Sequence, residues 1–291
     1  MLNPLYTPKK YFFLRGHNRS GTTWLARLLN LHPQICCMGE FYLESFKKQL
    51  AVLCNIPHCL FHKQDLNIAA HIALEHFTKT VMLASLQETG KDNVVWVGDR
   101  TPEKICPIPI HGAPVFLIVR DGRDVLVSKA HHVLLQANHV SFRHIPAMLH
   151  KSDLFRRDQQ YFLQHPHELL DCEEWVRAFT RSWNTHVMAD AQYIEQMPDT
   201  DRQHIKVIQY EELHAHTEQV RAELYEFLGV SPTLAAPLDS ITLPGCPNPN
   251  PWSLHRRGQP RQWLEYFTEA TEQWFLDEAS EALKYYGYID A

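Results

Sequence analysis

One segment near the start of the chain combines two glycines, a cation and hydroxyl side chains at a spacing that suits phosphate binding. An apolar run leads into Gly16, and Gly21 follows just ahead of a helical pattern over Thr22–Asn30. Backbone N–H groups at the N-terminus of a helix point outward, and the helix dipole favours an anion there. The glycine spacing equals that of the nucleotide P-loop, but Thr22 stands where the phosphate-bridging lysine would be. Arg19 supplies a cation from inside the loop instead.

A second group of polar residues follows another apolar run, Val115–Val119. Arg120 comes next, and Ser128 lies in a predicted helix over Val125–Gln136. Ligands of open α/β sheets bind at the carboxyl ends of strands, so an arginine fork and a hydroxyl there suit a second phosphate. An N-cap role for Asp124, with Arg120 in a structural ion pair, explains the same residues equally well.

Both segments match a known family. The stretch Arg-Ser-Gly-Thr-Thr-Trp-Leu at residues 19–25 resembles the 5′-phosphosulfate loop of sulfotransferases that use 3′-phosphoadenosine 5′-phosphosulfate (PAPS). Residues 120–128 resemble the 3′-phosphate motif of the same family, which implies that Arg120 and Ser128 are ligands. The residues that the resemblance places at the 5′ end of PAPS are Arg19, Ser20, Gly21, Thr22, Thr23 and Trp24.

Two further matches complete the donor site that the resemblance implies. The segment that begins with Arg256 and Arg257 looks like the family's C-terminal Arg-Lys-Gly-x-x-Gly-x-Trp motif, although Arg261 replaces its second glycine. We therefore expect Arg256, Arg257 and Gly258 at the 3′-phosphate. Tyr210 opens a Tyr-Glu-Glu-Leu stretch similar to the family's Tyr-Glu-Asp-Leu, whose tyrosine lies by the adenine. A core tyrosine at a strand end is the alternative.

The resemblance implies in-line displacement at sulfur, with 3′-phosphoadenosine 5′-phosphate (PAP) as the product. Negative charge grows on the bridging oxygen as PAP leaves, and fixed hydrogen-bond donors stabilise that charge. Arg19 and the backbone N–H groups of residues 20–23 fit that role, and Arg100 matches the family's basic residue near the sulfuryl group. A sulfuryl group carries less charge than a phosphoryl group, so we expect no metal. Cysteines and histidines do cluster over residues 54–62, but not at a zinc-finger spacing.

The acceptor hydroxyl needs a base, and three residues are candidates. Glu40 follows a His-Pro pair, where it matches the glutamate that some family members use. Other members use a histidine in a Lys-Thr-His segment, but here no histidine follows Thr101. We therefore expect Glu40 to be the base, with Asp99 and His17 in reserve. A surface carboxylate without a catalytic role is the alternative for Glu40.

Apolar runs and helical periodicity place these motifs on alternating strands and helices. Such alternation predicts an α/β fold with a P-loop-type parallel β-sheet flanked by helices on both faces. The predicted strands are Tyr11–Arg15, Val94–Gly98, Val115–Val119 and Ile205–Gln209. The predicted helices are Thr22–Asn30, Ile68–Gln87, Val125–Gln136, Cys172–Gln196, Glu218–Leu228 and Thr268–Tyr286.

Two stretches lack such patterns and predict long loops. His139–Glu168 is rich in His, Arg and Gln and contains Pro146 and Pro166, and Pro232–Pro260 holds seven prolines. Long loops in a compact domain are usually lids or binding loops. We expect the first loop to shape the acceptor pocket. We also expect a single sulfotransferase domain over residues 1–291.

The composition is that of an ordinary globular protein. Of the 291 residues, 45% are hydrophobic and 21% charged, which excludes a disordered chain. The 33 Asp and Glu residues outnumber the 28 Lys and Arg residues, which disfavours a general nucleic-acid binder. Seven cysteines without a CxxC pair favour reduced thiols in the cytoplasm. The chain shows neither a signal-peptide pattern nor a run of about 18 apolar residues that would span a membrane.

The sequence therefore predicts a PAPS-dependent sulfotransferase that acts on a hydroxyl of a small-molecule or carbohydrate acceptor. Two other classes stay open. A P-loop small-molecule kinase would share the loop, but the missing lysine and the pair of Arg120 and Ser128 disfavour it. A nucleotide-binding protein without turnover would keep the donor residues and lack a working acceptor site.

Overall fold

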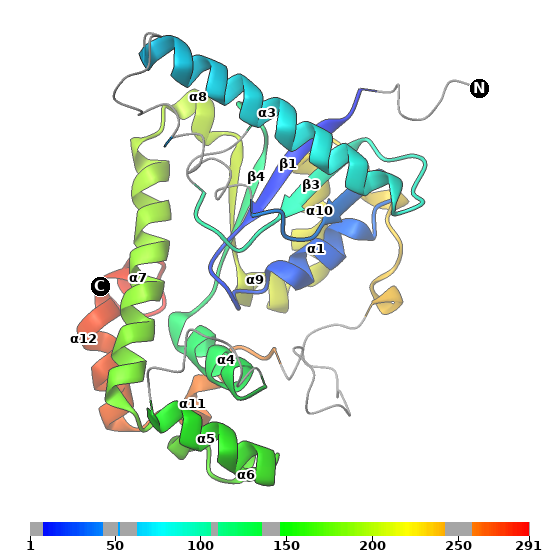
Figure 1. The fold of residues 1–291 in the computed structure, drawn as a ribbon. Helices are drawn as coiled ribbons and strands as arrows, with labels where there is room; N and C mark the ends of the chain where they lie inside the picture. The colour runs from blue at the N-terminus through cyan, green and yellow to red at the C-terminus, as the bar shows by residue number, and fades with distance from the viewer. Residues whose placement is uncertain are drawn as a thin grey trace.

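A parallel β-sheet lies at the centre of the computed structural model (Figure 1). The structure describes residues 8–42, 52, 63–105, 110–135, 146–241 and 258–290. In these ranges the sheet has five strands in the order β2-β3-β1-β4-β5, and every neighbouring pair is parallel. The strands are β1 (Lys10–Arg15), β2 (Ile35–Met38), β3 (Trp96–Arg100), β4 (Val115–Val119) and β5 (Ile205–Gln209).

Helices cover both faces of the sheet because each strand sends alternate side chains to opposite sides. On β1, Phe12 and Leu14 pack on one face and Phe13 on the other. The first face is covered by α1 (Thr22–Asn30), α9 (Tyr210–Ala215) and α10 (Thr217–Phe227). The second is covered by α3 (Lys63–Gln87), α4 (Gly122–Leu135), α7 (Glu173–Gln196) and α12 (Glu269–Tyr285). The predicted α/β class is therefore confirmed.

The remaining elements, most of them short, connect these strands and helices. Figure 1 shows α7 as a long helix with α12 packed beside it, while α4, α5, α6 and α11 gather near one end of α7. The shorter elements are α5 (Pro146–Arg157), α6 (Tyr161–Gln164), η3 (Pro166–Leu170), α8 (Asp199–Arg202), η4 (Pro232–Leu234), η5 (Leu238–Ser240) and α11 (Trp263–Tyr266). In the described ranges, no helix is both long and apolar enough to cross a bilayer.

The strands differ from the prediction in three places. β1 begins one residue earlier than expected, at Lys10. β3 begins two residues later than expected, so that Asp99 and Arg100 both lie on the strand. β2 is absent from the prediction, since four residues are too few to show a period. It forms because Ile35 and its neighbours pair in register with β3 at the edge of the sheet. The bounds of β4, β5 and α1 are those predicted.

The predicted loop over His139–Glu168 is wrong where the structure describes it. From Pro146 onward the chain folds into α5, α6 and η3. Pro146 and Pro166 begin helices, where a proline is tolerated because its missing N–H would have no partner in the first turn. Met148 and Phe155 lie seven residues apart and are both buried, which fixes α5 to the core. The role of this segment at the acceptor pocket stays a prediction.

The carboxyl ends of β1, β3 and β4 meet at one edge of the sheet. Arg15 and Arg100 end β1 and β3, and Arg120 directly follows β4. Ligands of open α/β sheets bind outside such strand ends, where the strand order reverses around the first strand. The topology therefore collects cations from three neighbouring strands at the edge where a ligand is expected.

Gly98 of β3 leaves no room for a side chain. A Cβ there would lie 2.1 Å from the ring of Phe12, which is fully buried. We expect Gly98→Ala to lower the free energy of unfolding by about 1–3 kcal/mol through overpacking. Gly39→Ala is the control, because nothing lies within 4 Å of a Cβ at that position. Urea denaturation measures both variants, and equal losses would contradict the prediction.

Candidate active site

The loop after β1 depends on close backbone packing at its two glycines. Gly16 has a φ of 150°, and a Cβ there would lie 2.4 Å from the carbonyl oxygen of Ile118 on β4. Gly21 has a φ of 100° and precedes α1, and a Cβ there would lie 2.5 Å from the ring of Tyr210. A side chain at either position would push the loop away from the sheet. Both glycines therefore allow the strand–loop–helix geometry that the sequence predicts.

The start of α1 presents backbone donors to the loop. The N–H of Leu25 is the first to bond within the helix, to the carbonyl of Gly21 at 3.0 Å. The N–H groups of Thr22, Thr23 and Trp24 belong to the first turn, which has no intrahelical acceptors. The expected set of N–H groups, residues 20–23, began two residues earlier, but the N–H of Ser20 donates to the carbonyl of His17 at 3.1 Å. The N–H of Ser20 is therefore bonded within the loop.

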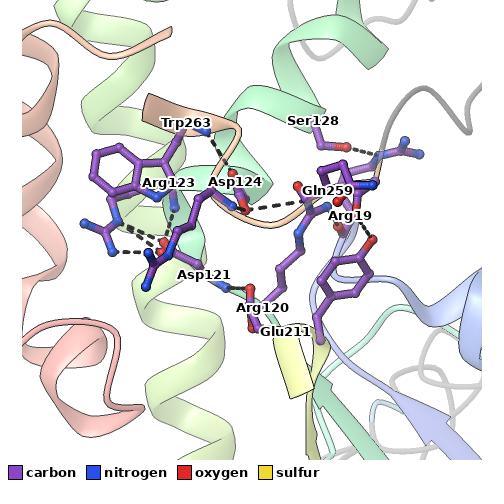
Figure 2. Close-up of polar contacts among 12 residues, drawn as sticks. Arg19, Arg120, Asp121, Arg123, Asp124, Ser128, Glu211, Gln259 and Trp263 are labelled. Atoms are coloured by element: carbon purple, nitrogen blue, oxygen red, sulfur yellow. Dashed lines mark hydrogen bonds and ion pairs between the residues drawn. The ribbon is translucent and has the colours of Figure 1, made fainter. Parts of the chain in front are cut away.

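Arg120 brings the second predicted phosphate motif against the loop (Figure 2). Its guanidinium donates to the carbonyls of Arg19 and Gln259, each at 3.4 Å, and lies 4.2 Å from the ring centroid of Tyr210. The side chain is only 5% exposed. Its Nε is buried and finds no acceptor in the described part of the protein.

Ser128 makes the second contact between the two motifs. Its hydroxyl accepts a hydrogen bond of 3.2 Å from Nε of Arg19, as Figure 2 shows. Ser20 of the loop has a buried hydroxyl without a partner among the described residues. Buried polar atoms in folded proteins are nearly always bonded, and an orphan calls for an explanation such as a ligand or water. Buried hydrogen-bond donors without an acceptor among the described residues thus lie on both motifs.

Asp124 holds the C-terminal segment over α4. Its carboxylate accepts the N–H groups of Arg261 at 2.7 Å and Trp263 at 2.9 Å, and lies 3.7 Å from Arg120. Burial raises the pKa of Asp124, while Arg120 opposes that shift. The N-cap role considered for Asp124 is wrong: α4 begins at Gly122, and Asp121 accepts the N–H of Arg123 there.

The C-terminal segment contacts Tyr210 through Gly258, whose place at the 3′-phosphate stays a prediction. The carbonyl of Gly258 accepts a hydrogen bond from the hydroxyl of Tyr210. Arg261, which replaces the family's second glycine, adopts a φ of 61° and so keeps a conformation that glycine favours. Arg256 and Arg257 lie outside the described residues, as does the cysteine–histidine cluster at 54–62.

Tyr210 occupies a more enclosed position than an open adenine platform would. The ring is 3% exposed and lies between the Arg120 guanidinium and Gly21. It therefore supports both phosphate motifs, and its contact with adenine stays a prediction.

On the other side of the loop, Arg100 joins Glu40 to the start of α1. Its Nη1 donates to the Thr23 hydroxyl at 3.1 Å and to a Glu40 carboxylate oxygen at 2.9 Å. The second oxygen of Glu40 accepts from the hydroxyl of Tyr42, and this bond raises the pKa of Tyr42 to about 12. The structure thus brings two predicted catalytic residues, Glu40 and Arg100, next to the predicted donor loop.

Asp99 is fully buried, and its carboxylate already has bonding partners. It forms an ion pair of 2.8 Å with Arg15 of the neighbouring strand and accepts the hydroxyl of Thr101 at 2.7 Å. It also accepts the N–H of Phe41 at 3.4 Å, next to Glu40 in the chain. These contacts give Asp99 an organising position between β1, β3 and the Glu40 segment.

His17 is buried between the loop and α7. Its Nδ1–H donates to the carbonyl of Asn18 at 2.8 Å, and its ring lies edge-on to Phe179 and His186. Burial and the neighbouring His186 lower the pKa of His17 to about 3. The imidazole is therefore neutral at pH 7 and a weak base.

Sequence reasoning missed two contributions to this site. The pair of Arg15 and Asp99 had a signal, because Arg15 ends one predicted strand and Asp99 directly follows another. Lys129 had none: it follows Ser128 on α4, and burial together with Arg19 lowers its pKa. Among the described residues, no group of three or more His, Cys, Asp and Glu side chains is arranged to hold a metal.

Two family models match the chain in succession. The model described as "Sulfotransferase family" matches residues 12–103, and the one described as "Sulfotransferase domain" matches residues 111–243. The chain belongs to the sulfotransferase family. The first match contains the loop, Glu40 and Arg100, and the second contains Arg120 and Ser128. No curated protein matches this sulfotransferase in sequence.

The chain is similar to several solved structures. Mouse sulfotransferase SULT7A1 complexed with PAP is 15% identical, with a TM-score of 0.48 over 96% of this chain and 86% of that one. A sulfotransferase from Alicyclobacillus acidocaldarius is 16% identical, with a TM-score of 0.48 over 98% of each chain. Retinol dehydratase in complex with androsterone and inactive cofactor PAP is 14% identical, with a TM-score of 0.42 over 98% and 82%.

The lowered pKa of His17 predicts an acid-sensitive fold for this sulfotransferase. The unfolded chain binds a proton near pH 6.5, whereas the folded chain does so only near pH 3, so acid favours unfolding. The stability that His17 contributes is present above pH 6.5 and lost as the pH falls toward 3. Between pH 7.5 and pH 5 that loss is about 2 kcal/mol.

The measurement is urea denaturation at both pH values for the wild type and for His17→Asn. We expect the variant to lose about 2 kcal/mol less than the wild type over this interval, whatever its stability at pH 7.5. Identical pH dependence in the two proteins would mean that His17 protonates freely in the folded state.

Proposed function

We propose that this protein transfers a sulfuryl group from PAPS to a hydroxyl of a small-molecule or carbohydrate acceptor. The observation that carries the proposal is the contact between the two anion-binding motifs. Arg19 of the loop donates to Ser128, and Arg120 donates to the carbonyl of Arg19. PAPS carries anionic groups at its 5′ and 3′ positions, and adjacent cationic motifs suit one ligand with two such ends.

Each motif has a role in donor binding. Arg120 and Ser128 bind the 3′-phosphate, and Arg256, Arg257 and Gly258 are proposed as further ligands of it. The backbone donors at the start of α1 bind the 5′ end, where the helix dipole favours an anion. The buried, unbonded Nε of Arg120 fits an anionic ligand, because an acceptor there would complete its hydrogen bonding.

In the transition state, negative charge develops on the bridging oxygen, which we expect beside the loop. Arg19 lies in the loop and Arg100 donates to Thr23 at its end, so both cations border the place expected for the bridging oxygen. Fixed donors of this kind stabilise developing negative charge without reorganisation, and one is worth about 3–4 kcal/mol. These cations are the reason that we propose transfer without a metal.

Glu40 is the proposed base for the acceptor hydroxyl. Its side chain is partly exposed, whereas Asp99 is fully buried and His17 is a weak base. Arg100 and Tyr42 both donate to the carboxylate and so hold it in place beside the predicted donor loop. An exposed carboxylate beside the donor loop is accessible to an acceptor, which supports Glu40 over the reserves.

We also propose that residues 1–291 form one domain and that the protein is cytoplasmic. The two family matches follow each other along one continuous sheet, which supports a single domain. Cys36, Cys37 and Cys172 are free thiols, as expected in a reducing compartment.

Recognition of the 3′-phosphate separates the sulfotransferase from a P-loop kinase. PAP should raise the melting temperature by several degrees at saturation, because a ligand that binds only the folded state stabilises it. ATP lacks a 3′-phosphate and should raise it much less. Calorimetry with both nucleotides, in wild type and Ser128→Ala, measures the difference. Equal stabilisation by ATP would favour the kinase.

Glu40→Gln separates chemistry from donor binding. The amide keeps the shape but cannot accept the proton, so turnover should fall about 10²- to 10⁴-fold while PAP affinity survives. Arg19→Ala is the comparison, because loss of the loop cation should weaken PAP binding and slow transfer together. The acceptor comes from a hydroxyl library screened with PAPS in excess EDTA, with a sulfate mass gain as the readout.

Near-normal turnover of Glu40→Gln, with loss of turnover in Asp99→Asn, would show that the base is misassigned. Loss of PAP affinity in Glu40→Gln would show that this carboxylate supports the loop instead.

A further inference from the structure

The carboxylate of Glu211, at the start of α9, joins two segments that the phosphate motifs do not otherwise connect. One oxygen accepts the backbone N–H of Asp121 at 3.1 Å, as Figure 2 shows. The other accepts the hydroxyl of Tyr288 at 3.0 Å, from the segment that follows α12. Asp121 is the residue after Arg120, so Glu211 binds the backbone next to the arginine that we propose for the 3′-phosphate.

Tyr288 reaches Glu211 from a well-defined position. Gly287 has a φ of 73° and turns the chain at the end of α12. The N–H of Tyr288 then donates to the carbonyl of Leu283 at 2.8 Å, which closes the last turn of the helix. The carbonyl of Tyr288 accepts from the guanidinium of Arg123 at 3.2 Å. These contacts fix the backbone of Tyr288, and so the place from which its hydroxyl donates.

Asp121 is bound from two directions. Its carboxylate accepts the N–H of Arg123 at 2.9 Å and the guanidinium of the same residue at 2.8 Å. Its own N–H donates to Glu211. That guanidinium also binds the Tyr288 carbonyl, so Asp121, Arg123, Glu211 and Tyr288 form one connected network. The network holds the turn that leads from β4 into α4.

We propose that Glu211 and Tyr288 are positioning residues for recognition of the 3′-phosphate of the donor. Tyr288 orients the Glu211 carboxylate, and Glu211 fixes the backbone that carries Arg120. The inference deepens the proposed function and rests on it. A guanidinium binds a phosphate through donors of fixed direction, so a small displacement of its backbone weakens binding.

The charges and burial of the network suit this role. Burial raises the pKa of Glu211, while the hydrogen bonds from Asp121 and Tyr288 and the charge of Arg120 oppose that shift. Burial and the neighbouring Glu211 raise the pKa of Tyr288, so its hydroxyl keeps its proton and stays a donor. Removing one partner of a buried hydrogen bond leaves the other unsatisfied, which costs more than the bond contributes. Loss of the Tyr288 hydroxyl should therefore move the Glu211 carboxylate.

The test compares PAP with adenosine 5′-phosphate, which lacks only the 3′-phosphate. Tyr288→Phe removes a single hydroxyl and should weaken PAP binding about tenfold in titration calorimetry, whereas the affinity for adenosine 5′-phosphate stays unchanged. Glu211→Ala should have the same effect. Glu211→Gln keeps an oxygen that accepts the N–H of Asp121 and should retain most of the PAP affinity.

Tyr285→Phe and Glu212→Gln are the matched controls. Tyr285 is exposed and its hydroxyl bonds to Glu195 of α7, and Glu212 is exposed beside Glu211 on α9. Both controls should leave the two affinities unchanged. The ratio of the two affinities does not depend on the fraction of folded protein, and Tyr288→Phe tests the network if Glu211→Ala fails to fold.

Equal PAP affinity in the wild type and Tyr288→Phe would overturn this inference while leaving the proposed function intact. Equal weakening of both nucleotides would also overturn it, because the network would then support the whole site. A loss in Glu211→Gln as large as that in Glu211→Ala would overturn it too, since the charge and not the acceptor would matter. Wild-type protein that binds both nucleotides equally well would overturn the proposed function, and the inference with it.

Discussion

The candidate phosphate motifs depend on the contacts of one buried guanidinium, that of Arg120. It contacts the loop through the Arg19 carbonyl, the C-terminal segment through the Gln259 carbonyl and α9 through the ring of Tyr210. Asp124 lies 3.7 Å away and is fully buried. Removing one member of such a pair leaves a buried charge without a partner, which usually costs more than the pair contributes. Arg120 therefore fixes the relative positions of three segments that are far apart in sequence.

The same pair holds the strained backbone of the site in place. Arg19 and Arg261 both have positive φ values, a conformation that costs a non-glycine residue about 1 kcal/mol or more. Arg120 binds the carbonyl of Arg19, and Asp124 binds the N–H of Arg261. Each member of the pair thus fixes one strained residue. Strain of this kind persists only where the surrounding contacts over-determine it, and it is typical of ligand-binding loops.

The Glu40 side of the candidate site is organised by a second buried pair, Arg15 and Asp99. This pair joins neighbouring strands of the sheet and positions Phe41 through its N–H. Arg100, the next residue on β3, then reaches Glu40 and Thr23. Asp99 and Arg100, which are consecutive on β3, thus have different roles, because their side chains point to opposite faces of the sheet. The buried acid fixes the framework, and the partly exposed arginine contacts the groups that we expect to take part in transfer.

The sequence by itself determined the α/β class, the bounds of β4, β5 and α1, and the approximate places of two other strands and five other helices, and it indicated two candidate donor motifs. Those features depend on local patterns: apolar runs of strand length, helical periodicity, and glycines at fixed offsets from a helix start. Local patterns also explain the failures. The four residues of β2 are too few for a period, and Pro146 and Pro166 indicated loops because a proline that breaks a helix and one that begins it look alike in sequence.

Only the tertiary structure decided which residues of the motifs act together. In the folded chain, the Arg19 side chain bonds to Ser128, and Asp124 bonds to the C-terminal segment instead of capping a helix. Asp99 is buried, whereas Glu40 stays accessible. These outcomes depend on contacts between segments up to about 140 residues apart, such as Asp124 with Trp263. Burial, and with it the charge state and accessibility of each group, is a property of the packed chain that no local pattern encodes.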